Sequence, residues 1–305
     1  MIMGIPAGEK SDVILSPEFL RRLARLKLET RTILGGVMKG EKRSRRYGTS
    51  VEFADYRDYH RGDDLRYLDW NIYARLERFF LKLFHEEEDL TVHILLDQSA
   101  SMATGNPSKL LHARQLAAAL AYIALTNHDR MAVTPFSDIL GKGTRFLRGR
   151  AHIATVLSHI NGLETGSRTN FAESMKEFTL RYRQKGLVFV ISDFFDPVNL
   201  EAGLKRLSNS GHELMLIQVL DKTELEPDIR GDWALTDNET GDVVEVSVSP
   251  KLIADYKRRI LGYLNELKDT SRKIGAGYIV TTTGTPVEEF ILKELVHGSC
   301  VRFQG

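Results

Sequence analysis

The apolar run Val92-His93-Ile94-Leu95-Leu96 is followed directly by Asp97-Gln98-Ser99-Ala100-Ser101. The apolar run predicts a buried strand. Asp97, Ser99 and Ser101 alternate along the turn after it, so three hard oxygen ligands lie on one side of the turn. An octahedral Mg²⁺ takes oxygen ligands at short distance and keeps some of its waters. The stretch therefore predicts a metal-binding turn at the end of a buried strand.

Two distant segments offer the rest of a ligand shell. Thr169 comes just before a helical pattern, and Asp193 ends the predicted strand 187–192. Open α/β sheets bind ligands beyond the carboxyl ends of their strands, so these oxygens are expected to converge. The predicted site is metal-binding and consists of Asp97, Ser99, Ser101, Thr169 and Asp193.

A purely structural interpretation of the same residues stays open. In that interpretation Ser99 and Ser101 cap the helix that follows the strand, and Asp97 accepts hydrogen bonds from nearby backbone N–H groups.

From residue 90 onward, strand and helix patterns alternate along the chain. The predicted strands are 91–96, 130–136, 187–192, 213–220 and 278–282. The predicted helices are 109–125, 151–160, 170–183, 200–208, 250–274 and 286–296. Short strands separated by helices imply parallel pairing with right-handed crossovers. We therefore expect an α/β fold with a doubly wound, mostly parallel sheet flanked by helices.

The flanking segments are harder to place. Residues 16–28 predict a capped amphipathic helix with a proline in its first turn, and residues 79–84 predict a strand. Residues 233–246 predict a β-hairpin with Asn and Gly in its turn. This hairpin, an insertion near 232–247, stands beside the sheet or adds an extra edge to it, and the second is favoured. The expected division is an N-terminal helix and extension, 1–88, packed on a main domain, 89–305.

The proposed ligands carry a family resemblance. The chain resembles a von Willebrand factor A domain, a Rossmann-type fold, with a complete metal-ion-dependent adhesion site. The motif Asp-x-Ser-x-Ser, its threonine and its second aspartate fall, in order, on Asp97, Ser99, Ser101, Thr169 and Asp193. The resemblance implies that Thr169 binds the ion directly or through water, and that Asp97 and Asp193 often bind through water. It also implies an open coordination position for a carboxylate of a partner protein.

Upstream segments narrow the resemblance further. Residues 52–59, 62–70 and 74–75 are similar to the bacterial domain of unknown function 58 family. That family implies a protein partner, a MoxR-type AAA+ ATPase, and an adaptor role in complex assembly or maturation. The implied cofactor is Mg²⁺, or Mn²⁺ or Ca²⁺ in its place.

Two charged segments have alternative interpretations. Acids and arginines alternate densely over residues 52–75. This pattern fits a partner-docking surface, a segment that positions the metal-binding turn from the side, or a salt-bridged clamp that fastens the N-terminal segment to the sheet. Residues 39–46 are basic, as expected of a solvated loop or of a contact with RNA, phosphate or an acidic partner.

Bulk properties exclude several classes. The 305 residues are 42% hydrophobic and 27% charged, as in a soluble globular protein. A formal net charge of +1 argues against nucleic-acid binding through bulk charge. Cys300 is the only cysteine, so a disulfide framework is excluded. No apolar run reaches the roughly 18 residues of a membrane span, and residues 1–6 lack signal-peptide features, so a cytoplasmic location is expected.

The sequence favours a binding module over an enzyme. It contains no P-loop, no nucleophile elbow and no histidine spaced to act as a general base beside the predicted site. Serines that ligate a metal ion are also unavailable as nucleophiles. A metal-dependent phosphoester hydrolase and a structural interaction domain with an empty metal site remain as alternatives.

Overall fold

The computed structural model describes residues 15–29, 53–61, 63, 65–84, 90–166, 169–196, 199–229, 231–236, 243–296 and 301–303. The chain divides into a larger unit, residues 1–37 with 90–305, and a smaller unit, residues 38–89. The sequence-based division put residues 1–88 together as one extension. Its boundary near residue 89 coincides with the start of the main sheet, but residues 15–29 belong to the larger unit.

The larger unit is built on a five-stranded sheet in the order β10-β7-β6-β4-β5, and every neighbouring pair of strands is parallel. The strands are β4 (Thr91–Asp97), β5 (Arg130–Phe136), β6 (Leu187–Ser192), β7 (Glu213–Leu220) and β10 (Gly277–Thr282). From β4 the chain moves to one side of the sheet to form β5, and it then returns to form β6 on the other side of β4. The topological switch point therefore lies between β4 and β6, which confirms the doubly wound α/β fold.

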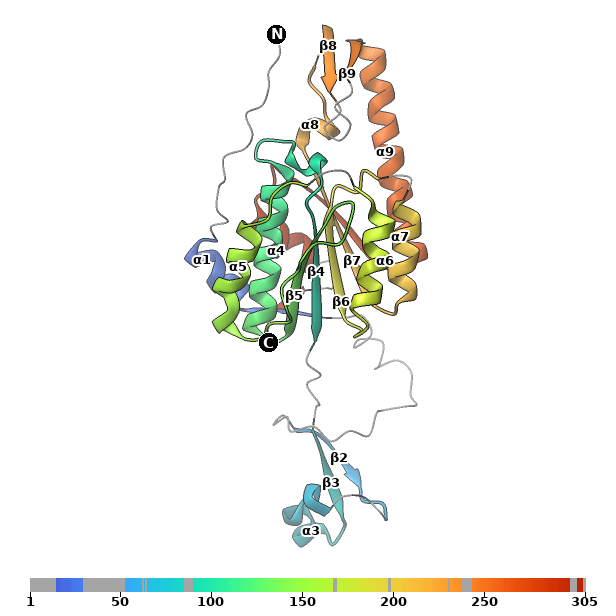
Figure 1. Ribbon diagram of the computed structural model, residues 1–305. Coiled ribbons are helices and arrows are strands. Elements are labelled where there is room, and N and C mark those ends of the chain that lie inside the picture. Colours follow the sequence, from blue (N-terminus) through green and yellow to red (C-terminus); the bar gives the residue numbers. More distant parts are fainter. Residues whose placement is uncertain are drawn as a thin grey trace. The chain divides into compact units, whose positions relative to one another are not determined.

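Helices cover both faces of this sheet (Figure 1). The helices are α1 (Pro17–Leu23), α4 (Lys109–Thr126), α5 (Ile153–Asn161), α6 (Phe171–Arg181), α7 (Leu200–Asn209), α8 (Lys222–Leu225), α9 (Pro250–Lys273) and α10 (Val287–Glu289), the last continued by the π-helical turn η4 (Phe290–Leu295). Two separate hydrophobic cores result, one under α1, α4, α5 and η4, and the other under α6, α7 and α9.

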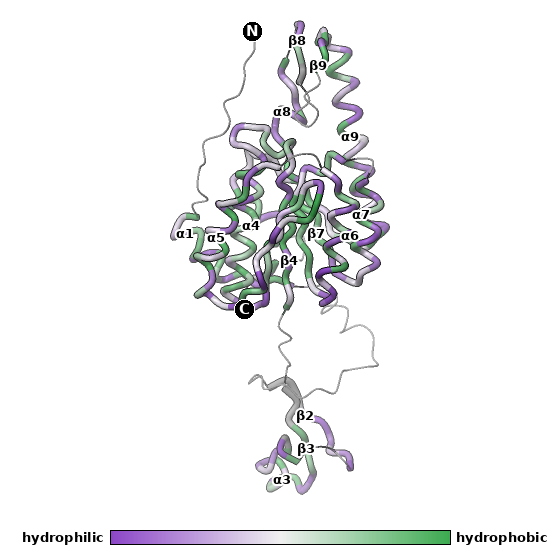
Figure 2. The backbone as a smooth tube through the Cα atoms, in the orientation of Figure 1, coloured by the Kyte–Doolittle hydropathy of each residue, from purple (hydrophilic) through white to green (hydrophobic). Residues whose placement is uncertain are grey.

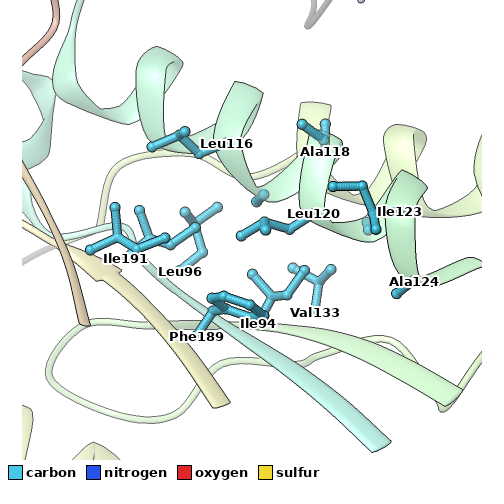
Figure 3. Close-up of a cluster of buried hydrophobic side chains, with 14 of the residues drawn as sticks. Ile94, Leu96, Leu116, Ala118, Leu120, Ile123, Ala124, Val133, Phe189 and Ile191 are labelled. Carbon is cyan, nitrogen blue, oxygen red and sulfur yellow. The ribbon is translucent and has the colours of Figure 1, made fainter. Parts of the chain in front are cut away.

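Helix α4 lies at the centre of the first core. Its alanines and leucines are buried over most of its length, since it packs against the sheet and also against α1 and α5. Figure 3 shows side chains of α4 facing those of the strands, including Leu116, Leu120 and Ile123 above Ile94, Leu96, Val133, Phe189 and Ile191. Hydrophobic residues are concentrated along the central strands (Figure 2).

The N-terminal helix is shorter than the sequence predicts. Ser16 caps α1 by accepting a hydrogen bond from the Phe19 N–H, but the helix ends at Leu23. Leu26 and Leu28 belong instead to β1 (Leu26–Leu28), which pairs antiparallel with β11 (Val301–Phe303). Residues 26–28 and 301–303 therefore form one small sheet, and Leu26 and Leu28 are buried in the first core.

The predicted hairpin forms, but the favoured placement as an extra edge of the main sheet is wrong. Strands β8 (Gly231–Thr236) and β9 (Val243–Val248) pair antiparallel in a two-stranded sheet of their own. The predicted turn residues 238–241 lie outside the described residues. The hairpin is inserted between α8 and α9, and it follows β7 at the end of the sheet where the strands finish (Figure 1).

The smaller unit consists of an antiparallel pair, β2 (Phe53–Asp58) with β3 (Phe80–Phe84), joined through the 3-10 turn η1 (Leu65–Tyr67) and α3 (Trp70–Leu76). Asp69 caps α3 by accepting from the Asn71 and Ile72 N–H groups. Arg57 pairs with Asp63 at 3.0 Å, and Arg78 pairs with Asp58 at 3.4 Å. At least part of the acid–arginine block is therefore satisfied within this unit. The basic segment 39–46 lies outside the described residues.

Candidate metal centre

Two aspartates stand at neighbouring strand ends, beside the switch point of the sheet. Asp97 is the last residue of β4, and Asp193 directly follows the last residue of β6. Because β4 and β6 are paired with Leu96 opposite Ile191, the two strands finish almost level. Both side chains are buried, with 1% and 2% of their surface exposed. Parallel pairing alone thus brings together two carboxylates from positions far apart in the sequence.

Hydrogen bonds fix the Asp97 carboxylate. Its Oδ1 accepts from the Ser99 N–H at 2.8 Å, and its Oδ2 accepts from the Ser192 hydroxyl at 2.5 Å. The Ser192 Oγ in turn accepts from the Phe194 N–H at 2.8 Å. Ser192 therefore connects the end of β6 to the carboxylate on β4, and it holds Asp97 in one orientation.

The two serine hydroxyls of the turn lie together. Ser99 Oγ and Ser101 Oγ are 3.1 Å apart, and Ser99 is fully buried. Ser99 precedes the short 3-10 helix η2 (Ala100–Ala103), but its side chain makes no capping hydrogen bond there. The capping interpretation of Ser99 is therefore not supported, whereas Asp97 does bind a backbone N–H group as that interpretation required.

Asp193 lies in a more crowded position. Its Oδ1 accepts from the Phe195 N–H at 3.1 Å, and its Oδ2 accepts from the Lys109 ammonium at 2.7 Å. Its backbone carbonyl accepts from the Gln218 amide at 2.8 Å. The next residue, Phe194, has a φ of 57°, which is unusual for a bulky side chain. Burial of the Phe194 ring and a hydrogen bond from the Tyr263 hydroxyl to its carbonyl hold this conformation.

Charge is concentrated and shielded from water here. Burial raises the pKa of the Asp97 carboxyl well above its ordinary value, and the neighbouring Asp193 charge raises it further. Burial alone lowers the pKa of Lys109, but the charges of Asp193 and Glu224 outweigh this effect and raise it. The ammonium therefore stays protonated, and the two aspartates repel one another. A divalent cation bound between the two carboxylates would reduce this repulsion.

The segment that carries Thr169 is joined to the same strand ends. On one side of it, the Gly166 N–H donates to the Gln98 carbonyl, in the turn after β4. On the other side, the Asn170 N–H donates to the Ser137 carbonyl at 3.0 Å, just after β5. Asn170 then caps α6 by accepting from the Glu173 N–H at 3.1 Å. Thr169 is half-buried between these two attachments.

The residues present fit a hard divalent cation. Two buried carboxylates and two adjacent hydroxyls, all oxygen donors, are the ligand types that Mg²⁺ and Ca²⁺ use. Within the described parts of the chain, this site included, no group of three or more His, Cys, Asp or Glu side chains is placed to hold a metal ion, so the donor set here depends on the serine hydroxyls as well as on the two aspartates.

Sequence reasoning missed four polar residues around the site. Lys109, which is buried, pairs with the half-buried Glu224 at 2.6 Å, Ser192 orients Asp97, and Gln218 binds the Asp193 backbone. Ser192 and Gln218 lie within strands that the sequence does predict, and each is a polar residue in an apolar run. That interruption is a usable signal. The sequence around Lys109 and Glu224 gives no such signal, because each residue looks like a solvated charge at the start of a helix.

The fold and this arrangement define an α/β protein with two buried carboxylates and two serine hydroxyls at the switch point of a doubly wound sheet. The chain matches the family described as "Protein of unknown function DUF58" over residues 55–262, and it belongs to that family. It is 29% identical over 269 residues to an uncharacterized protein of Mycobacterium tuberculosis, with 85% of this chain and 83% of the relative covered. An uncharacterized protein of Mycobacterium avium is 31% identical over 119 residues, which covers 39% of this chain and 69% of that relative.

The solved structures to which the chain is similar have low sequence identity to it. BatB from Bacteroides thetaiotaomicron, a conserved hypothetical protein, gives a TM-score of 0.43 at 15% identity, with 69% of this chain and 98% of that chain covered. An aerotolerance-related membrane protein from Bacteroides fragilis gives a TM-score of 0.43 at 17% identity, with 68% and 99% covered. In the described part of the present chain, no helix is both long and apolar enough to cross a membrane.

Proposed function

We propose that this chain is a divalent-cation-dependent protein–protein interaction module of the von Willebrand factor A type. The observation that carries the proposal is the pairing of buried Asp97 and Asp193 at adjacent strand ends, with Ser99 and Ser101 beside them. This is where open α/β sheets bind their ligands. The residues that would hold Mg²⁺, or Mn²⁺ or Ca²⁺, are Asp97, Ser99, Ser101, Thr169 and Asp193.

The chemistry favours recognition of an acidic side chain. When bound, a divalent cation supplies an electrophilic centre that takes a partner's carboxylate as a further ligand. The chain's own residues have two roles in this scheme. Ser192 and the backbone amides fix the two aspartates, and the hydroxyls of Ser99 and Ser101 supply neutral donors, which leave the cation's charge less neutralised.

The surface at the same end of the sheet suits a protein partner. Exposed apolar side chains occur on the β8–β9 hairpin and the first turns of α9, among them Val243, Val244 and Leu252, which are 61%, 59% and 41% exposed. The hairpin is inserted directly after α8, whose Glu224 contacts Lys109 beside Asp193. By family resemblance, the partner is a MoxR-type AAA+ ATPase, and the role is that of an adaptor in complex assembly or maturation.

A phosphoester hydrolase is the second candidate, but the contacts at the site favour it less. The groups that bind Asp97 and Asp193 are a serine hydroxyl, backbone amides and a protonated lysine. None of these is a general base for water attack. A structural interaction domain with an empty site is the remaining alternative. Its affinity for a partner would be the same with and without a chelator.

The test is capture of partners from native lysate by the purified chain, with Mg²⁺ and with EDTA in parallel. The expected result is an AAA+ ATPase captured only with Mg²⁺, and lost in Asp97→Ala. Thr169→Ala separates two roles, since it should still bind metal but capture the partner poorly. Equal capture with Mg²⁺ and with EDTA contradicts the proposal, and Mg²⁺-dependent turnover of phosphoesters supports the hydrolase instead.

A further inference from the structure

A lysine ammonium is buried beside the proposed metal site. Lys109 begins α4, yet only 1% of its side chain is exposed. Its Nζ lies 2.7 Å from Asp193 Oδ2 and 2.6 Å from Glu224 Oε1, and 5.1 Å from the centre of the Phe195 ring. Removing an ammonium from water costs several kcal/mol unless charged partners offset it. A lysine at the start of a helix also lies at the positive end of the helix dipole, so helix electrostatics do not explain it.

The two carboxylates that hold the ammonium are themselves fixed. Glu224 completes a capping box at α8, in which its Oε2 accepts from the Asp221 N–H at 2.8 Å. Asp193 is fixed through its Oδ1 by the Phe195 N–H. The ammonium therefore lies between two immobile anions, one of which is a proposed metal ligand and the other of which is not.

We propose that Lys109 is a built-in counter-cation that sets how tightly the site binds a divalent ion, and that Glu224 moderates it. The inference rests on the proposed metal site. The ammonium neutralises part of the charge of Asp193, so less of that charge is available to an incoming cation. Glu224 shares the ammonium and thereby limits this effect. The site is thus expected to hold its ion weakly enough for the ion to exchange.

Two substitutions should move the metal affinity in opposite directions. Lys109→Gln removes the competing charge, and we expect it to tighten Mg²⁺ binding by about tenfold, since a unit charge a few ångströms away acts strongly in a buried site. Glu224→Gln removes the charge of one of the two carboxylates that contact the ammonium, and we expect Mg²⁺ binding to weaken by about tenfold for the same reason. Lys205→Gln is the matched control, because Lys205 carries the same charge in an exposed pair with Glu201, 62% and 67% exposed.

The measurement is titration of each full-length protein with Mg²⁺ by calorimetry and with Mn²⁺ by electron paramagnetic resonance. Melting temperature is recorded with EDTA and with Mg²⁺. Lys109→Gln leaves Asp193 and Glu224 without their cation, so we expect it to melt lower in EDTA and to recover with Mg²⁺. If Lys109→Gln does not fold, Glu224→Gln alone tests the proposal. Weaker Mg²⁺ binding by Glu224→Gln than by the parent supports the proposal, and equal or tighter Mg²⁺ binding overturns it.

The outcomes separate this inference from the function on which it rests. If the parent binds Mg²⁺, and if Lys109→Gln and Glu224→Gln bind it with the same affinity as the parent and Lys205→Gln, the counter-cation role is wrong and the metal site stands. If the parent binds no divalent ion but Lys109→Gln does, Lys109 holds the site closed and the proposed function fails. If no protein binds a divalent ion, both are wrong.

Discussion

At the scale of single residues, Asp97 combines burial with the charge of a second carboxylate. Both effects raise its pKa, so in the absence of a cation the ionised side chain weakens the fold. Asp97→Asn keeps the shape of the side chain and an acceptor for the Ser99 N–H. We expect this variant, in EDTA at pH 8, to be more stable than the parent by about 1 kcal/mol.

Chemical denaturation with EDTA and with Mg²⁺ measures this difference. Mg²⁺ should stabilise the parent and leave Asp97→Asn unchanged, because the variant lacks a charged ligand. If Asp97→Asn is less stable than the parent in EDTA, the hydrogen bonds of the Asp97 carboxylate stabilise the fold by more than its buried charge destabilises it.

The placement of Asp97 and Asp193 at neighbouring strand ends could be predicted from the sequence, because the apolar run before each of them is a local pattern. Asp97 and Asp193 each end an apolar run, and parallel pairing then brings them together. Lys109 could not be found in this way. Its burial depends on Glu224 in α8, more than a hundred residues away, and no local pattern distinguishes it from a solvated lysine.

The buried histidine His93 makes the stability of the fold depend on pH. The ring of His93 packs among Phe146, Phe178 and Tyr182, at centroid distances of 5.1 to 5.2 Å. Burial, with a smaller effect of the His212 charge, lowers the pKa of His93 from 6.5 to about 3. Between these values the unfolded chain binds a proton that the folded chain does not. The free energy of unfolding therefore falls as pH falls, by about 1.4 kcal/mol per pH unit for this group.

His93→Phe removes that proton and keeps an aromatic ring in the cluster. We expect unfolding measured by urea at pH 4 to 7 to depend less steeply on pH in the variant than in the parent. The control is His128→Asn, since His128 is exposed and an asparagine tolerates its φ of 62°. Equal slopes for His93→Phe and the parent would assign the acid sensitivity to other groups.

At the scale of elements, the packing of α6 on α7 depends on a glycine. A Cβ added to Gly203 in α7 would lie 2.4 Å from the ring of Phe171 in α6, whereas a Cβ on Gly262 in α9 would meet nothing within 4 Å. Alanine favours a helix over glycine by about 1 kcal/mol at both positions. We expect Gly203→Ala to destabilise the protein by about 1–3 kcal/mol through overpacking. Gly262→Ala should stabilise it by up to about 1 kcal/mol.

Paired urea denaturation curves measure both changes. The two substitutions are chemically identical. If one destabilises the protein and the other stabilises it, the difference is due to the close approach of α6 to α7 at Gly203. Stabilisation by both substitutions would mean that Phe171 moves aside at little cost.

The elements that the sequence predicts well are those whose pattern is set by burial on the sheet. Strands β4, β6 and β7 are largely apolar runs, and α4 is rich in alanine and leucine. The sequence predicts a helix through Leu26 and Leu28 because their apolar spacing continues that of α1. Their strand pairing is decided by residues 301–303, at the other end of the chain. A local pattern likewise does not specify whether the hairpin pairs with an edge of the main sheet or forms a separate sheet, as it does here.

At the scale of the whole molecule, the chain leaves the larger unit after residue 37 and returns at residue 90. Residues 15–29 should therefore contribute to the stability of the main fold, and residues 38–89 should not. Replacing 38–89 with a glycine–serine linker should leave the unfolding transition of the larger unit at the same temperature. Deleting residues 1–37 removes Leu23, Leu26 and Leu28, each at most 2% exposed, from the first core.

Each of those leucines contributes roughly 1.5–3 kcal/mol by burial, and together they approach the whole stability of a typical domain of about 5–15 kcal/mol. We therefore expect the deletion of 1–37 to lower the melting temperature sharply or to prevent folding, as followed by circular dichroism. The linker variant is the control for chain interruption. If it melts early as well, residues 38–89 stabilise the main fold, as the packing of an N-terminal extension on the main domain requires. If it melts with the parent, the smaller unit is free to serve recognition rather than stability.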